Sequence, residues 1–278
     1  GDLAVRSGNA SGITDSGTVT VGGNLAATTD AANGLINLGT LAVNGTVALT
    51  TNGNGAATVV NDAGLDFAAS TVRGALSATA TTGDIVDSGN LVVTGTSTFI
   101  TGADGSNIIL DASGNAFSQV VRLKADTGGN ETFGNITFVN SGNVKIKPST
   151  QATNLYIDAA TDGAVGGNLS VTSTTGKIHQ WAGGPLTVGG TSSFTTLANN
   201  KRIVLNNANA FTGAVSLNTT GSSAYATVVD ASGLNLGAST VGGYLIATAT
   251  TGNITDSGNL TIAGTSSFTT SATDATIT

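Results

Sequence analysis

The feature that most constrains the fold of this chain is a long internal repeat. Thr58–Thr101 and Thr227–Thr270 align without a gap, and 28 of the 44 positions are identical. Both copies carry the run A-T-A-T-T-G, then I-x-D-S-G-N-L, and then G-T-S-x-F. Repetition of this kind predicts copies of one structural unit that stack on each other, because each copy buries its apolar face against its neighbours.

A shorter pattern of strands and turns runs through the whole chain. Gly-Asn-Leu or Gly-Asn-Val openings recur, with the asparagine at Asn24, Asn90, Asn143, Asn168 and Asn259. After each opening the apolar residues tend to alternate with polar ones, which is typical of a strand that buries one face. No stretch of more than ten residues carries a glycine-free apolar stripe with helical spacing. We therefore expect very little helix.

Two all-β folds agree with this pattern. Tandem immunoglobulin-like sandwiches fit the longer spacing, which is marked by Gly12, Gly83, Gly176 and Gly252. Such sandwiches bury Trp, Tyr or Phe between their sheets, whereas aromatic residues make up only 4% of this chain. The shorter spacing fits a parallel β-helix, because G-x-[LIV]-x-[VI] units recur about every 18–25 residues. We predict an all-β, right-handed parallel β-helix (β-solenoid).

The predicted β-helix is a single continuous segment of about 11–13 coils. The steps from Val121 to Val144 and from Val144 to Leu169 are expected to span one coil each. The longer repeat then groups the coils into super-repeats near residues 12–82, 83–175, 176–251 and 252–278. Because the chain opens and stops in mid-pattern, we expect it to be a segment of a longer protein.

The residue types suit the corners and the interior of such a coil. Glycine supplies positive φ at corners, and asparagine tolerates the same conformation and can form amide ladders between stacked coils. Small Ala, Ser and Thr side chains let coils approach at the strand spacing of about 4.8 Å. The predicted interior is a stack of Val, Leu and Ile, with phenylalanine at intervals at Phe99, Phe194 and Phe268.

Composition excludes several classes of function. The net charge of −7 argues against nucleic acid as a partner, since phosphate binding needs concentrated Lys and Arg. The chain has no cysteine, which removes disulfides and thiolate metal sites and suits an oxidising exterior. No apolar run approaches the roughly 20 residues of a membrane helix, so we expect no membrane insertion.

The sequence offers little for catalysis or for a cofactor. His179 is the single histidine, which rules out a multi-histidine metal site and leaves one possible base for a triad. We interpret His179 as a loop or surface residue. Asp15, Asp87 and Asp256 lie in D-S-G turns, where we expect each carboxylate to cap its own turn. We predict no catalytic residue, no metal site and no cofactor, and hence no enzyme.

The most distinctive local feature is basic. Five of the nine Lys and Arg residues lie in one stretch: Arg122, Lys124, Lys145, Lys147 and Lys177. If the apolar residues between them point inward on neighbouring coils, Arg122 stacks beside Lys145 and Lys124 beside Lys147. Like charges opposite each other are mildly unfavourable. One interpretation is an anion-binding patch for acidic glycan or lipopolysaccharide, and the other is a solvated face that blocks lateral aggregation of the sheet.

Trp181 is the single tryptophan, in a loop that replaces the D-S-G-N corner. The segment from Gly176 to Leu186 is two residues longer than the matching Gly252–Leu260. One interpretation is that the indole is exposed and stacks on a sugar ring or anchors a neighbouring protein. The alternative is that Trp181 folds back over the loop and covers apolar surface.

The G-N-L-x-[VI] openings, the A-T-A-T-T-G-[DN]-I-x-D-S-G-N-L block and the G-T-S-x-F block resemble the repetitive shafts of filamentous-haemagglutinin-like bacterial adhesins. The resemblance covers nearly the whole chain and is weakest between Asn115 and Asn154. The secretion domain of that family, with its N-P-N-type motifs, is missing here. The resemblance implies a β-helical spacer that projects from a Gram-negative surface and helps adhesion or aggregation.

We therefore expect a structural shaft of a secreted or surface-anchored adhesin, located outside the cell. Its partners are expected to be copies or neighbouring segments of itself, through end-to-end or lateral association, and surface glycans. The alternative is a glycan-binding β-helix module that uses the basic residues and Trp181.

Overall fold

In the computed structural model, the described residues are 1–125, 134–146, 155–157, 164–181 and 184–278. The chain forms two compact units, Gly1–Val139 and Asn140–Thr278. In each unit parallel strands wind into a β-solenoid, with about 11 turns in total over the two units. The described residues contain no helix. The predicted parallel β-solenoid is confirmed.

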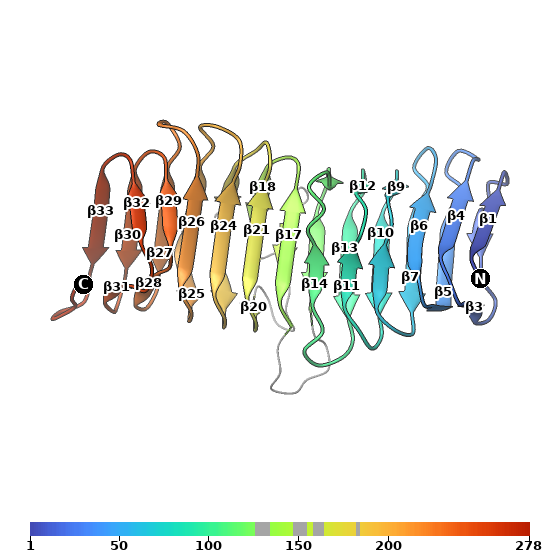
Figure 1. Ribbon diagram of the computed structural model, residues 1–278, viewed down its shortest axis with the longest axis horizontal. Coiled ribbons are helices and arrows are strands. Elements are labelled where there is room, and N and C mark those ends of the chain that lie inside the picture. The colour runs from blue at the N-terminus through green and yellow to red at the C-terminus, as the bar shows by residue number, and fades with distance from the viewer. Residues whose placement is uncertain (126–133, 147–154, 158–163, 182–183) are drawn as a thin grey trace. The chain divides into compact units, whose positions relative to one another are not determined.

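The first unit has two parallel sheets on opposite sides of its coils, and Figure 1 shows β1, β4 and β6 of the first sheet side by side. The first sheet contains β1 (Leu3–Ser7), β4 (Leu25–Thr29), β6 (Thr46–Thr50), β8 (Leu65–Phe67), β9 (Ser70–Val72), β11 (Ile85–Asp87), β12 (Leu91–Val93), β14 (Ile108–Leu110), β15 (Ala116–Phe117) and β17 (Ile136–Asn140). The second contains β2 (Ile13–Thr14), β3 (Val19–Val21), β5 (Ile36–Val43), β7 (Ala57–Asn61), β10 (Leu76–Ala80), β13 (Ser97–Thr101) and β16 (Val121–Lys124).

The second unit is built in the same way. Its first sheet contains β21 (Leu169–Ser173), β24 (Ser192–Thr196), β26 (Val215–Thr219), β28 (Leu234–Leu236), β29 (Ser239–Val241), β31 (Ile254–Asp256) and β32 (Leu260–Ile262). Its second sheet contains β18 (Val144–Ile146), β19 (Leu155–Ile157), β22 (Ile178–Gln180), β25 (Ile203–Phe211), β27 (Ala226–Asp230), β30 (Leu245–Ala249) and β33 (Ser266–Thr270). Two short strands, β20 (Ala164–Val165) and β23 (Thr187–Val188), pair with each other, and β23 also pairs with β25.

Most paired strands are one short coil apart. A short step joins Ala57 to Leu76, and a somewhat longer one joins Ile178 to Ile203. Both steps agree with the predicted spacing. The prediction that Val144 and Leu169 are one coil apart is wrong, because Val144 pairs with Ile178, much further along the chain. The intervening chain adds β19, which pairs with β18, and Leu169 lies in the other sheet.

The two copies of the long repeat form the same strands. Strands β7 to β13 in the first unit correspond to β27 to β33 in the second, and every boundary is shifted by the same number of positions. Ala57–Asn61 thus becomes Ala226–Asp230, and Ser97–Thr101 becomes Ser266–Thr270. The repeat therefore encodes a repeated structural unit, as predicted.

Alternate residues of each strand point into the coil and form the core. Phenylalanine rings stack along the interior of the first unit: Phe67 meets Phe99 edge to face at 6.1 Å between ring centroids, and Phe99 meets Phe117 at 5.9 Å. Phe194 and Phe211 form a similar pair in the second unit. The predicted interior positions of Phe99 and Phe194 are confirmed, since both are fully buried.

The asparagine of the openings ties one coil to the next. Its side-chain oxygen accepts a hydrogen bond from the backbone N–H of the equivalent residue one coil later. The Asn107 N–H donates to Asp84 Oδ1 at 2.7 Å, and the Asn135 N–H donates to Asn107 Oδ1 at 2.8 Å. Elsewhere Asn33 and Asn200 adopt the left-handed conformation, with φ of 65° and 59°. Both predicted roles of asparagine are confirmed.

The aspartates of the D-S-G turns bond mainly to a neighbouring coil. Asp15 accepts hydrogen bonds from the backbone N–H groups of Gly39 and Thr40. Asp87 accepts one from the Asp111 N–H and one from the Asn115 side chain. The expectation that Asp15 and Asp87 cap their own turns is wrong, because stacking places the next coil within reach. For Asp256 it stays a prediction. Burial raises the pKa of Asp87 despite these donors.

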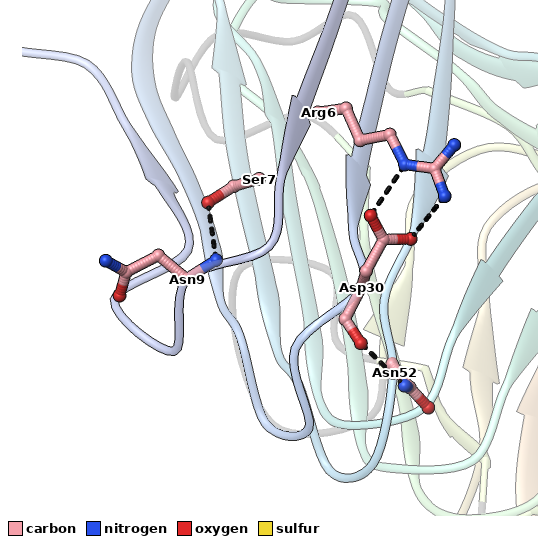
Figure 2. Close-up of polar contacts among 5 residues, drawn as sticks. All are labelled: Arg6, Ser7, Asn9, Asp30 and Asn52. Atoms are coloured by element: carbon pink, nitrogen blue, oxygen red, sulfur yellow. Dashed lines mark hydrogen bonds and ion pairs between the residues drawn. The ribbon is translucent and has the colours of Figure 1, made fainter.

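A surface ion pair links the first two coils of the first unit. Figure 2 shows the Arg6 guanidinium facing the Asp30 carboxylate in a bidentate arrangement, with N–O distances of 2.6 and 2.9 Å. The Asn52 side chain, one coil further on, donates to the Asp30 carbonyl oxygen at 2.8 Å. Because Arg6 is 74% exposed, the pair contributes little stability.

The described residues include no helix with the length and apolarity needed to span a membrane.

We predict that replacing Phe99 by alanine costs about 3–5 kcal/mol of unfolding free energy, because the substitution leaves a cavity between Phe67 and Phe117. Phe268 occupies the same place in the second copy but is only half-buried. Phe268→Ala is therefore a matched control that is expected to cost less than half as much. Urea unfolding followed by circular dichroism measures both. Equal costs would contradict the view that the next coil completes the core.

Candidate functional site

The structure describes five of the six predicted binding residues. Arg122 and Lys124 lie on β16 in the first unit, where they pair with Thr98 and Ile100 of β13. The second unit holds Lys145 on β18, Lys177 just before β22 and Trp181 just after it. Lys147 lies outside the described residues.

The nearest described neighbour of Lys145 along the sheet is a histidine. Lys145 pairs with His179 of β22, one coil away in the same unit. Arg122 and Lys145 belong to different units. The predicted neighbours Arg122 and Lys145, and Lys124 and Lys147, therefore stay a prediction.

Within the second unit, cations and aromatic rings gather on the outer side of one sheet. We call this surface the basic aromatic face. It consists of Lys145, Lys177, His179, Trp181, Arg202, Tyr225 and Tyr244. Trp181 is 49% exposed and Tyr244 is 39% exposed, so ring surface in this face is open to solvent.

Coil-to-coil register puts four of these residues in one row. Each precedes the first inward residue of its strand, and these inward residues pair as Ile178 with Ile203, Ile203 with Ala226, and Ala226 with Leu245. The row itself is Lys177, Arg202, Tyr225 and Tyr244. The carbonyl oxygens of the last three accept backbone hydrogen bonds from the strand before, at 2.9–3.0 Å. The backbone ladder therefore fixes the order of the side chains.

The side chains in this row contact one another. The rings of Tyr225 and Tyr244 stack almost in parallel, with 4.5 Å between their centroids and 7° between their planes. The Arg202 guanidinium carbon lies 5.8 Å from the Tyr225 ring centroid, a cation–π contact. Tyr244 has a raised pKa, from burial first and then from its neighbour Tyr225.

A second group surrounds Trp181. The Lys145 Nζ lies 5.8 Å from the centroid of the Trp181 ring, and His179 meets the same ring edge to face at 6.1 Å. Beneath the loop, the buried side chains of Gln180 and Asn209 hydrogen-bond to each other at 2.5 Å. This buried pair holds the strand end from which Trp181 projects.

Positive charges dominate the electrostatics of the basic aromatic face. The pKa of His179 is lowered, first by burial and then by the charges of Lys177, Arg202 and Lys145. Among the described residues, none of these three cations forms a salt bridge. The Arg202 Nε is buried and has no hydrogen-bond partner in the described part of the chain. The face therefore offers cationic donors that an added anion can satisfy.

Sequence reasoning missed four residues of this face: His179 as a member of a cluster, Arg202, Tyr225 and Tyr244. A signal for the two tyrosines was present in the repeat. When the alignment of the two copies is extended by two positions, Tyr225 stands opposite Ala56, and Tyr244 stands opposite Ala75. The strand pattern is the same in both copies, so the change adds aromatic surface without changing the fold.

The described residues contain no group of three or more His, Asp or Glu side chains arranged to hold a metal ion.

We predict that the pKa of His179 measured by NMR lies below its usual 6.5. Lys177→Gln removes a nearby positive charge and is expected to raise that pKa toward 6.5. Lys124→Gln removes the same charge at a residue that is not among the causes of this pKa shift and is the matched control. Because His179 is the single histidine, its ring signals need no separate assignment. An equal change in both variants would contradict the described cluster.

Comparison with known sequences assigns the family but no activity. The chain matches the family described as Repeats of unknown function (DUF5649) over residues 54–124, 134–218 and 223–278. The first match contains one copy of the long repeat, and the matches after it include the second copy. No curated protein and no solved structure matches the chain. Since the matched segments cover well over half of its length, the chain belongs to this family of repeats of unknown function.

Proposed function

We propose that this chain is a structural shaft segment of a secreted or surface-anchored bacterial adhesin. The observation that carries the proposal is the stacking of similar coils through parallel backbone pairing within each unit. Each coil adds about 4.8 Å along the stack, and each coil supports only its neighbours. Such a protein acts mechanically, by setting a distance and a stiffness rather than by transforming a substrate.

A coil of this kind offers an open edge to a further coil. Leu91, Val93 and Phe99 are fully buried in the first unit, where β15 and β16 pair with their strands. Their equivalents in the second copy, Leu260, Ile262 and Phe268, are only half-buried. Leu260 and Phe268 also line a groove of about 580 Å³, together with Ile254 and Ile277.

The occupant that fits this groove is another coil of the same repeat. Strand β33 leaves one row of backbone groups without a paired strand among the described residues, and a parallel strand with the same alternation satisfies them. The covering strands of the first unit supply the pattern: Val121–Lys124 pairs with β13 at the position equivalent to β33. A following repeat or a second copy of the chain carries the same pattern, so coaxial self-association belongs to the proposed role.

The adhesin part of the proposal rests on sequence. The repeated blocks resemble the shafts of filamentous-haemagglutinin-like adhesins, and the absence of cysteine suits an oxidising exterior. We predict that an antibody against this chain labels intact producing cells as strongly as permeabilised ones. An antibody against a cytoplasmic protein is the control. Labelling that appears only after permeabilisation would overturn the surface role.

We also predict that the chain self-associates through its open edge, so that its sedimentation coefficient rises with concentration. Phe268→Asp places a charge in the groove and is expected to weaken that association at least tenfold. Thr248→Asp, on the outward side of the paired strand β30, is the matched control and is expected to leave it unchanged. A sedimentation coefficient of the wild type that does not change with concentration would contradict self-association. The proposed role would then be that of a spacer within one chain.

A further inference from the structure

We propose that the basic aromatic face of the second unit binds an acidic polysaccharide, one that carries carboxylate or sulfate groups on its sugar rings. This inference does not depend on the shaft role, because it concerns side chains on the outside of one unit. The proposed site differs from the anion-binding patch predicted from the sequence, because it consists of residues that the fold brings together.

The cations of the face match an anionic ligand chemically. Lys145, Lys177 and Arg202 surround His179 closely enough to depress its pKa. The Arg202 guanidinium presents several N–H donors in a planar fork that matches a carboxylate or a sulfate. Its buried Nε has no partner among the described residues, and burying an unpaired donor costs free energy. The residue as a whole is only half-buried, so an oxyanion is expected to bond to those N–H donors of the guanidinium that reach solvent.

Aromatic surface beside the cations suits the rings of a sugar polymer. The C–H face of a sugar ring is apolar and packs against an aromatic ring, while its hydroxyl groups stay in water. Trp181 is half exposed next to Lys145, and Tyr244 is more than a third exposed. A polymer that alternates apolar sugar faces with anionic groups can contact the aromatic rings and the cations within a few strand spacings.

The order of the side chains in the row sets the direction of the ligand. The row runs from Lys177 through Arg202 and Tyr225 to Tyr244, across four paired strands at about 4.8 Å each. Trp181 and Lys145 belong to the same end of the row, where β18 and β22 pair, with Trp181 at the opposite end of β22 from Lys177. An extended chain that lies across the strands therefore meets the cations first and the stacked tyrosines next.

The charge of the face favours a polysaccharide over a nucleic acid. A nucleic acid carries a phosphate at every nucleotide, and its affinity depends on neutralising many of them. This face provides three permanent cations in a chain of net charge −7. Few cations next to exposed rings suit a polymer with more widely spaced charges and larger apolar surfaces.

Trp181 fluorescence tests the proposal directly, because it is the single tryptophan and lies in the face. The ligands are dextran sulfate and polygalacturonate, with neutral dextran as the uncharged control and a single-stranded oligothymidylate as the nucleic acid. Titration at low salt is expected to change the emission with both acidic polysaccharides and not with neutral dextran. Binding should weaken as salt is raised, since salt screens exposed charges.

Two variants locate the site. Lys177→Gln combined with Arg202→Gln is expected to weaken binding at least tenfold, while Arg73→Gln, an exposed arginine of the first unit, should change it by less than twofold. Unchanged thermal unfolding of the double variant shows that the fold is intact. The pKa of His179 is expected to rise when polygalacturonate binds, because the carboxylates offset the nearby cations.

Three outcomes would overturn the proposal. The first is an unchanged Trp181 spectrum with both acidic polysaccharides, which leaves the face as a solvated surface. The second is an equal loss of binding in Arg73→Gln, which makes the attraction a general effect of charge. The third is tighter binding of the oligothymidylate, which makes the face a nucleic acid site. None of these outcomes affects the self-association expected of the shaft.

Discussion

Parallel backbone hydrogen bonding between consecutive coils is the interaction on which the rest of the structure depends. It places each residue next to its equivalent one coil later, at the strand spacing. Like side chains therefore meet like side chains. The Asp84–Asn107–Asn135 ladder at the corners of the first unit and the stacked Tyr225 and Tyr244 on the second unit follow from this rule. The Phe67–Phe99–Phe117 contacts inside the first unit instead join its two sheets across the core.

Close stacking also limits what the corners can contain. A Cβ added to Gly83 would lie 2.8 Å from the backbone N of Gly64, and one added to Gly252 would lie 2.7 Å from the backbone N of Gly233. Real Cβ atoms do not approach backbone atoms this closely, so the two copies need glycine at the same place for the same reason. The glycine of the A-T-A-T-T-G run is thus a packing requirement of the coil.

Inward and outward positions are under different constraints. Inward side chains must fill the same space in every coil, and overpacking or cavities there cost stability. Outward side chains touch only their neighbours in the row and solvent. Replacement of the alanines at positions 56 and 75 by tyrosines at 225 and 244 therefore leaves the strands unchanged while it adds an aromatic surface. A repeat fold of this kind can acquire a binding face without a change in its core.

The repeated blocks, the glycine and asparagine corners and the alternating apolar residues were enough to predict the fold class, the repeated unit and the buried Phe99 and Phe194, because these follow from local periodicity. The partner of Val144 was predicted wrongly, since the coils differ in length and spacing alone does not set the register. For the same reason, the sequence did not predict the row from Lys177 to Tyr244. Its members are each a whole coil apart in sequence, and only the strand pairing in the folded coil makes them neighbours.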